Sequence, residues 1–403
     1  MKFPFSYFHL SGFRFHPFLT LMPEGPEVRR YAVQLAQVLD GEKLVEVSAR
    51  TKAAKAWLGE HPGELVGRRV RRVRAHGKNM VGEIEGGFYF YSHLMMWGRW
   101  QIEDKAHRVL ERVPEDAENG GGESEREEDQ SAKSERESAR DKSDEAQSDK
   151  RNRDERNRDQ GNKREKVEAD ENERERRERA CISTAQHRAI LLSAPVFEIG
   201  QGQPFRDIEY LRSLGPDILP YEDDGVWDEH EFLHRLMSDE KSHGGAREIG
   251  AALLDQTVCA GIGNYLRAEI LFGCKVNPWT RIADLTSENL ECLNHEIPRI
   301  AMLAFANAGA TADEAQRERM RLESGLTYAP GREYGTRHLA FRRTNLPCLV
   351  CGDLIRQKRQ VTRVLDDEEK SRIIYFCPTC QNVKLEEKPK RVRRVKKSAQ
   401  ETV

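Results

Sequence analysis

The hydrophobic pattern changes from helical to β-like early in the chain. Between Pro26 and Leu39 apolar residues recur every three or four positions, which predicts a helix that closes at Gly41. From Lys43 to Ile102 the apolar residues fall in short runs separated by glycines, as in an antiparallel sandwich or barrel. The expected strands are LVEVSAR, VRRVRAH, MVGEIEG, FYFYSHL and RWQIE, and HRAILLSAPVFEI supplies the remaining ones.

The β pattern is interrupted by a segment, 104–180, that is almost wholly charged or polar. Such a composition cannot bury enough apolar surface to offset the loss of chain entropy, so we expect disorder there. Because surface loops tolerate added length, we expect the segment to be inserted at a hairpin loop of the β domain, where it acts as a solvated spacer.

Helical spacing returns from Tyr210 onward, in DEHEFLHRLM, EIGAALLDQTVCAG, GNYLRAEILFG and LTSENLECLNHEIPRIAMLAFANAG. One helix is expected to end at Ala260, and Asn264 is expected to open the next. Short strands then surround two CxxC pairs, and the chain ends in KPKRVRRVKK. The expected organisation is a leader or over-extended start at 1–21, a β domain at 22–103 and 181–209, an insert at 104–180, a helical domain at 210–335, a cysteine hairpin at 336–383 and a basic disordered tail at 384–403.

Composition changes this picture little. The chain of 403 residues is long enough for two ordered domains, and its 33% of charged residues reflects the insert. The net charge of −2 hides a basic C-terminal part, so it does not argue against a nucleic-acid partner. No apolar run is long enough to cross a bilayer, and we expect a monomer with no membrane contact.

Four of the eight cysteines are paired as CxxC: Cys348 with Cys351, and Cys377 with Cys380. Four thiolates in two such knuckles close a tetrahedral shell around one Zn2+ with no open position, which predicts a structural site and not a catalytic one. The alternative is a set of buried or redox-active cysteines. The overall cysteine pattern favours a metal site in a reducing compartment over a disulfide framework.

Two further segments contain residues that could bind a ligand or take part in catalysis. The GIGN turn before Asn264 lets the backbone approach a ligand, and the N–H groups at the start of the following helix favour a phosphate. A glycine turn that joins two core helices would give the same pattern. In MPEGPEVRR, removal of Met22 would free the α-amine of Pro23, whose pKa of about 8 leaves a usable neutral fraction for attack on a sugar carbon. The plain alternative is an ordinary helix start.

Together these segments resemble the formamidopyrimidine-DNA glycosylase/endonuclease VIII family, and its endonuclease VIII (Nei) branch most closely. The segments that carry the resemblance are MPEGPEVRR, YSHLMMWGRW, LGPDIL, LLDQTVCAGIGNYLRAEIL and YFCPTCQ, which cover most of 22–102 and 187–381. The resemblance implies an α+β fold with two domains. An N-terminal antiparallel β-sandwich with a flanking helix would precede a helix–two-turn–helix domain with a zinc-finger β-hairpin.

The resemblance also assigns roles to single residues. Pro23 matches the family's Schiff-base nucleophile, Glu24 its proton donor and Glu27 a supporting carboxylate. Lys78 matches the lysine that contacts phosphate and assists β-elimination, although a solvated charge at a strand end would look the same. The resemblance further matches Arg372 to the finger arginine that supports δ-elimination, Asn264 to a phosphate-binding asparagine, and Met95, Met96 and Trp97 to the loop that fills the gap left by a flipped base. For Trp97 a place in the β-sandwich core is an equal alternative.

The implied activity is that of a bifunctional DNA glycosylase and AP lyase acting on double-stranded DNA with an oxidised base or an abasic site. The purine-directed branch carries an Asp-Pro-Arg-Arg-Phe-Gly segment where this chain has LLSAPVFEIGQG, which favours oxidised pyrimidines as substrates. The mechanism requires Pro23 to be the first residue of the mature chain, so we expect initiation at Met22 or cleavage before Pro23. The expected compartment is the cytoplasm or nucleoid of a bacterium, or the nucleus of a eukaryote.

Two other functional classes are compatible with parts of the sequence. A catalytically inactive damaged-DNA-binding protein of the same fold would keep the cysteine hairpin and Asn264 but not a free amine at Pro23. A zinc-ribbon interaction factor would explain the cysteines but neither MPEGPE nor GIGNYLRAE.

Overall fold

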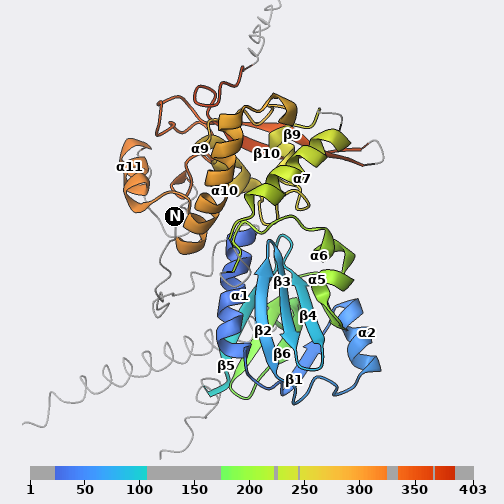
Figure 1. Cartoon of the computed structure of the whole chain (residues 1–403). Helices are drawn as coiled ribbons and strands as arrows, with labels where there is room; N and C mark the ends of the chain where they lie inside the picture. The colour runs from blue at the N-terminus through green and yellow to red at the C-terminus, as the bar shows by residue number, and fades with distance from the viewer. Residues whose placement is uncertain are drawn as a thin grey trace, which may run out of the picture. The chain divides into compact units, whose positions relative to one another are not determined.

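The computed structural model describes residues 23–106, 174–221, 226–243, 246–324, 335–365 and 368–385. The expectations for the leader, for most of the charged insert and for nearly all of the basic tail therefore lie outside the described residues. The chain divides into two compact units (Figure 1). Of the described residues, one unit, which is largely helical, contains those up to Arg30, the segment Ala75–Lys78 and those from Ile208 onward. The other unit contains those of Tyr31–Arg74 and of Asn79–Asp207.

The β unit contains two four-stranded sheets, in the orders β1-β6-β7-β5 and β2-β3-β4-β8. The aromatic rings of Phe90, Trp100 and Phe197, which come from both sheets, lie with centroids 6.0 to 6.2 Å apart and join the two faces in one core. The predicted antiparallel sandwich is confirmed. Its strands are β1 (Glu46–Ala49), β2 (Val70–His76), β3 (Asn79–Ile84), β4 (Phe88–His93), β5 (Arg99–Asp104), β6 (Glu178–Ser183), β7 (His187–Leu192) and β8 (Val196–Gln201).

Strand β6 corrects the prediction for the charged insert. Disorder was expected throughout 104–180, yet Asp104 ends β5, and β6 begins at Glu178 and pairs with both β1 and β7. Ala180 and Ile182 of β6 are fully buried. A few apolar residues at the end of a charged segment are enough for a strand when strands on both sides supply its hydrogen bonds.

Most helices precede or follow these strands in the sequence. The predicted first helix is present as α1 (Gly25–Leu39), whereas the alanine-rich α2 (Lys52–Glu60), which packs on β8 and β1, was not predicted. The remaining elements are α5 (Pro204–Asp207), α6 (Glu209–Ser213), α7 (Glu229–Ser242), α8 (Ile249–Ala252), α9 (Asn264–Gly273), the short 3-10 helix η2 (Ile282–Asp284), α10 (Ser287–Ala306), α11 (Glu314–Ser324) and the hairpin strands β9 (Arg356–Leu365) and β10 (Glu368–Phe376). Within the described residues, none of these helices is both long and apolar enough to span a bilayer.

Helix α8 is shorter than the sequence predicts. The expected helix ran to Ala260, but α8 ends at Ala252, and turns, with an isolated β-bridge from Ala260 to Asp217, follow up to Gly263. The carboxylate of Asp255 accepts hydrogen bonds from the backbone N–H and the hydroxyl of Thr257, and from the guanidinium of Arg247. Short polar side chains that bond the nearby backbone compete with helix, so the helical pattern is interrupted there. Helix α9 begins at Asn264 as predicted.

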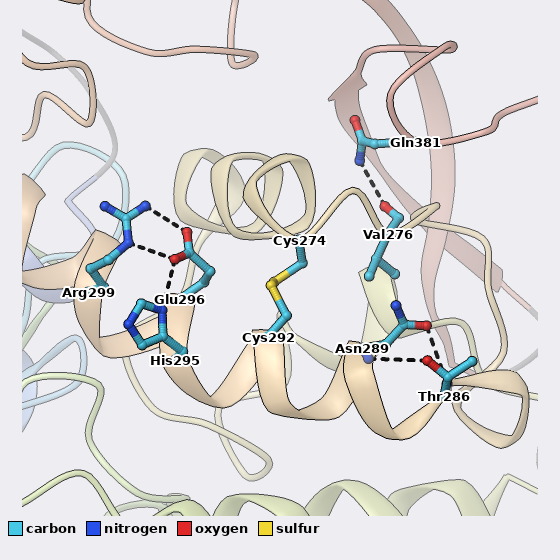
Figure 2. Close-up of a disulfide and its surroundings, with 9 residues drawn as sticks. All are labelled: Cys274, Val276, Thr286, Asn289, Cys292, His295, Glu296, Arg299 and Gln381. Carbon is cyan, nitrogen blue, oxygen red and sulfur yellow. Dashed lines mark hydrogen bonds and ion pairs between the residues drawn. A yellow bond between two sulfur atoms is a disulfide. The ribbon is translucent and has the colours of Figure 1, made fainter. Parts of the chain in front are cut away.

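Helices α9 and α10 are joined by a disulfide between Cys274 and Cys292 (Figure 2). Cys274 caps the C-terminus of α9 and Cys292 lies on α10, with their Cα atoms 5.6 Å apart. The sequence favours a metal site over disulfides, and the structure contains one disulfide in addition to the cysteine cluster. Spacing along the chain could not reveal this pair, because the two residues meet only once α9 and α10 pack together.

Candidate catalytic site

Glu24 lies at the N-terminus of α9, within the helical unit. Its two carboxylate oxygens accept backbone N–H groups from Gly263 at 2.8 Å, Tyr265 at 2.8 Å and Leu266 at 3.2 Å. A β-carbon at position 263 would overlap this carboxylate, so only glycine fits there. The sequence predicts a phosphate at these N–H groups, and the structure differs, since a side chain of the protein itself already occupies the positive end of the helix.

Glu27 is held beside Glu24. Its carboxylate accepts the backbone N–H of Glu24 at 2.9 Å and the hydroxyl of Tyr265 at 3.0 Å. Pro23, which directly precedes Glu24, is half-buried. Gly309 comes close on the other side, where a β-carbon would press against the Glu27 carboxylate. The carboxylates of Glu24 and Glu27 are thus both held in place close to Pro23, the expected nucleophile.

Lys78 joins this site from the loop after β2. Its ammonium donates to the carbonyl oxygen of Ile262 at 2.6 Å. Gly77 adopts a φ of 56°, and its backbone lies against Ala260 and Gly261, where a larger residue would collide. The alternative of a solvated strand-end charge is therefore wrong for Lys78, because its ammonium is bound to the turn before α9.

Burial and neighbouring charges raise the pKa of the two carboxyls, Glu24 and Glu27, and lower the pKa of Lys78. Burial raises the pKa of Glu24 to about 7, with a further increase from Glu27 and a partly opposing effect from Lys78. Burial likewise raises the pKa of Glu27 and lowers that of Lys78, on which the positive charge of Arg372 acts in the same direction. Near neutral pH Glu24 can therefore hold a proton and release it, as a general acid must.

A buried arginine, Arg267, connects Asn264 with the backbone next to Arg372. The guanidinium of Arg267 donates to Oδ1 of Asn264 at 2.7 Å and to the carbonyl oxygen of Ile373 at 3.0 Å. Arg372, the neighbour of Ile373, lies opposite Gln360 in the register of the β9–β10 hairpin. The structure thus gathers Pro23, Glu24, Glu27, Lys78, Asn264 and Arg372 in a single unit.

Met95, Met96 and Trp97 lie in the β unit, on the loop between β4 and β5. Their exposed fractions are 50%, 43% and 62%, whereas the preceding Leu94 is buried. The alternative that Trp97 belongs to the sandwich core is therefore wrong. Three large apolar side chains on one solvent-exposed loop fit a surface that contacts a partner.

The four predicted metal ligands come together. The sulfur atoms of Cys348, Cys351, Cys377 and Cys380 all lie within 4.8 Å of one another, and two of the separations are 3.4 and 3.8 Å. A tetrahedron with Zn–S bonds of about 2.3 Å has edges of about 3.8 Å. Backbone N–H groups of Val350 and Cys380 also point at two of the sulfurs. The cluster can therefore hold a metal ion, and its all-thiolate donor set fits zinc.

Three residues of the site were not singled out in the sequence. Tyr265 orients Glu27, Arg267 orients Asn264, and Gln256 binds the turn before α9 through Gly261 and Ile262. All three lie within LLDQTVCAGIGNYLRAEIL, so the motif contained them. Their roles depend on partners that only the fold identifies.

Two family models match the chain. The formamidopyrimidine-DNA glycosylase N-terminal domain matches residues 22–147, and the formamidopyrimidine-DNA glycosylase H2TH domain matches residues 228–315. The first match begins at Met22, one residue before Pro23. Between them the two models contain Pro23, Glu24, Lys78, the exposed apolar loop and Asn264.

Curated relatives and solved structures agree with these matches. Proteins named Endonuclease 8 from Salmonella arizonae and Klebsiella pneumoniae are 25% and 24% identical over 89% and 90% of this chain and over their whole length. Lactococcus lactis Fpg, solved in complexes with DNA that contains an abasic site or an oxidised pyrimidine, is 19% identical and has a TM-score of 0.54. It covers 89% of this chain and is itself covered to 99%. This structural likeness establishes the fold.

Proposed function

Because the chain belongs to the formamidopyrimidine-DNA glycosylase/endonuclease VIII family, and is thus a DNA glycosylase and AP lyase of DNA repair, we propose that it removes oxidised pyrimidines through a Schiff base on Pro23. The observation that carries this proposal is the buried Glu24, directly after Pro23, with its pKa raised to about 7. A carboxyl that is still protonated near neutral pH is suited to give its proton to the sugar or the leaving base.

The first step is displacement of the base. The neutral amine of Pro23 attacks C1′, and the base leaves with the bonding electron pair and takes up a proton. Ring opening then gives an iminium ion on Pro23, while the proton of the amine moves to O4′. Glu27, which accepts the backbone N–H of Glu24, keeps the acid and the nucleophile in register.

Strand cleavage follows from the iminium ion, which makes the C2′ proton acidic. Loss of that proton expels the 3′ phosphate in β-elimination, and a second elimination expels the 5′ phosphate. We assign contact with the phosphate and assistance in β-elimination to Lys78, and support of δ-elimination to Arg372. Burial, with the nearby charge of Arg372, lowers the pKa of Lys78, so its ammonium gives up a proton more readily than that of an ordinary lysine. We further propose that the four cysteines hold one structural Zn2+, which would stabilise the hairpin that carries Arg372.

Borohydride trapping tests the nucleophile. A chain that begins at Pro23 should form a covalent adduct with a duplex containing thymine glycol or 5-hydroxyuracil, because the reductant converts the iminium ion to a stable amine. A chain that begins at Met1 should form none, since its Pro23 nitrogen is part of a peptide bond. Intact-mass measurement of the protein from its native host then identifies the mature first residue.

The alternative is a damaged-DNA-binding protein without catalysis. It is favoured if residue 1 is retained on the native protein, or if the Pro23 form binds lesion duplex without forming the adduct. Substrate preference is tested separately, by comparing excision from duplexes with thymine glycol, dihydrouracil or 8-oxoguanine. Faster excision of 8-oxoguanine would contradict the proposed preference for pyrimidines.

A further inference from the structure

Arg267 of α9 is a fully buried cation of the helical unit. One terminal nitrogen donates to the carbonyl of Gly250 at 3.1 Å and to Oε1 of Gln360 at 3.2 Å. The other donates to Oδ1 of Asn264 and to the carbonyl of Ile373. A single side chain thus connects the start of α9 with both strands of the cysteine hairpin.

This contact determines which way the Asn264 amide faces. A guanidinium has only donors, so the atom of Asn264 that it touches must be the carbonyl oxygen. The NH2 group of Asn264 is then the end that faces away from Arg267 as a hydrogen-bond donor. An amide turned the other way would place two donors against each other and present an oxygen to any approaching anion.

Gln360 in turn holds Arg267. It is only 1% exposed, and its Oε1 accepts from Arg267 while its Nε2 donates to a carboxylate oxygen of Glu248 and to the carbonyl of Pro278, both at 2.8 Å. A β-carbon at position 250 would press against the amide of Gln360. The glycine at this position therefore makes room for that amide. Gln360 also lies opposite Arg372 in the register of the hairpin.

We propose that Gln360 is a positioning residue that, through Arg267, turns the Asn264 amide so that it donates to a DNA phosphate. This inference rests on the proposed function, because it assumes that DNA binds at Asn264. Gln360 does not touch the substrate in this scheme. Its effect should appear in DNA binding and should vanish when Asn264 is removed.

The test measures binding of the full chain to a duplex with a tetrahydrofuran abasic analogue, which cannot react, by fluorescence anisotropy. Gln360→Leu leaves Arg267 without this acceptor and should weaken binding about five- to tenfold, the usual size of one lost hydrogen bond. Gln357→Leu, on the same strand but exposed, is the matched control and should bind as the wild type does. In an Asn264→Ala background, Gln360→Leu should cause no additional loss.

A second variant separates positioning from stability. Gln360→Glu keeps the acceptor for Arg267 but loses the donor to Glu248 and to the carbonyl of Pro278, so its thermal midpoint should fall while its Kd stays within about twofold of the wild-type value. The inference is overturned if Gln360→Glu binds as weakly as Gln360→Leu, or if Gln360→Leu weakens binding equally with and without Asn264. A wild-type chain that does not bind the duplex contradicts the proposed function itself, whereas binding without coupling contradicts only the role of Gln360.

Discussion

Glu24 is subject to two opposing influences on its proton. Three backbone N–H groups at the start of α9 and the nearby Lys78 favour the carboxylate, whereas burial and the neighbouring Glu27 favour the neutral acid. Burial has the largest effect, and the pKa rises to about 7. A helix N-terminus alone would have lowered the pKa, so the direction of the shift follows from how deeply the group is enclosed.

This shift predicts a pH optimum for base release. Glu24 must be protonated, and its protonated fraction falls as pH rises through about 7, whereas Pro23 must be neutral, which requires pH near or above about 8. Single-turnover excision by the Pro23 form should therefore give a bell-shaped profile with its maximum between these values. Glu24→Gln should lower the rate by about 10²- to 10⁴-fold and abolish the alkaline limb.

The control is Glu291→Gln, a change at an exposed carboxyl of α10 that should leave the profile intact. Cleavage at a preformed abasic site has no base to protonate. It should be much less sensitive to Glu24→Gln than base release is. An alkaline limb that survives Glu24→Gln would assign the acid to another group.

At the scale of elements, periodicity predicted most strands and the helices α1 and α9, because each of these buries apolar side chains of its own. Strand β6 and the early end of α8 escaped the sequence, since one depends on its neighbours β1 and β7 and the other on the side chain of Asp255. The same division holds for the site. Motifs pointed to Glu24 and Asn264, but not to the helix end that Glu24 fills or to the arginine that orients Asn264.

The Cys274–Cys292 disulfide gives a prediction about stability. The two residues are 18 apart, and closing a loop of that length stabilises a fold by about 3 kcal/mol. Replacing both with serine should lower the thermal midpoint of the helical unit by about 6 to 12 °C in calorimetry. Reductant should lower the wild-type midpoint to a similar extent and leave the midpoint of the double serine variant unchanged. An equal effect of reductant on both proteins would place its action at the cysteine cluster instead.

At the scale of the whole molecule, the charged segment leaves and re-enters the same β unit. It follows β5 and returns before β6, and these strands flank β7 on either side. The guanidinium of Arg174, the first described residue after the segment, pairs with Glu103 near the end of β5. A replacement must join Ala106 to Arg174, and the length of the six-residue β7, on the order of 20 Å, is an upper limit for that gap.

Residues 107–173 should therefore be replaceable by a flexible Gly/Ser linker of about 12 residues, whose root-mean-square span of about 19 Å is sufficient for that gap. Shortening the loop reduces its closure entropy by about 1.5 kcal/mol, so the thermal midpoint should stay the same or rise by a few degrees. The segment mixes both charge signs, and a solvated spacer releases no counterions when DNA binds. The slope of log Kd against log salt should therefore be unchanged in the shortened chain, whereas a shallower slope with weaker binding would show that residues 107–173 contact phosphates.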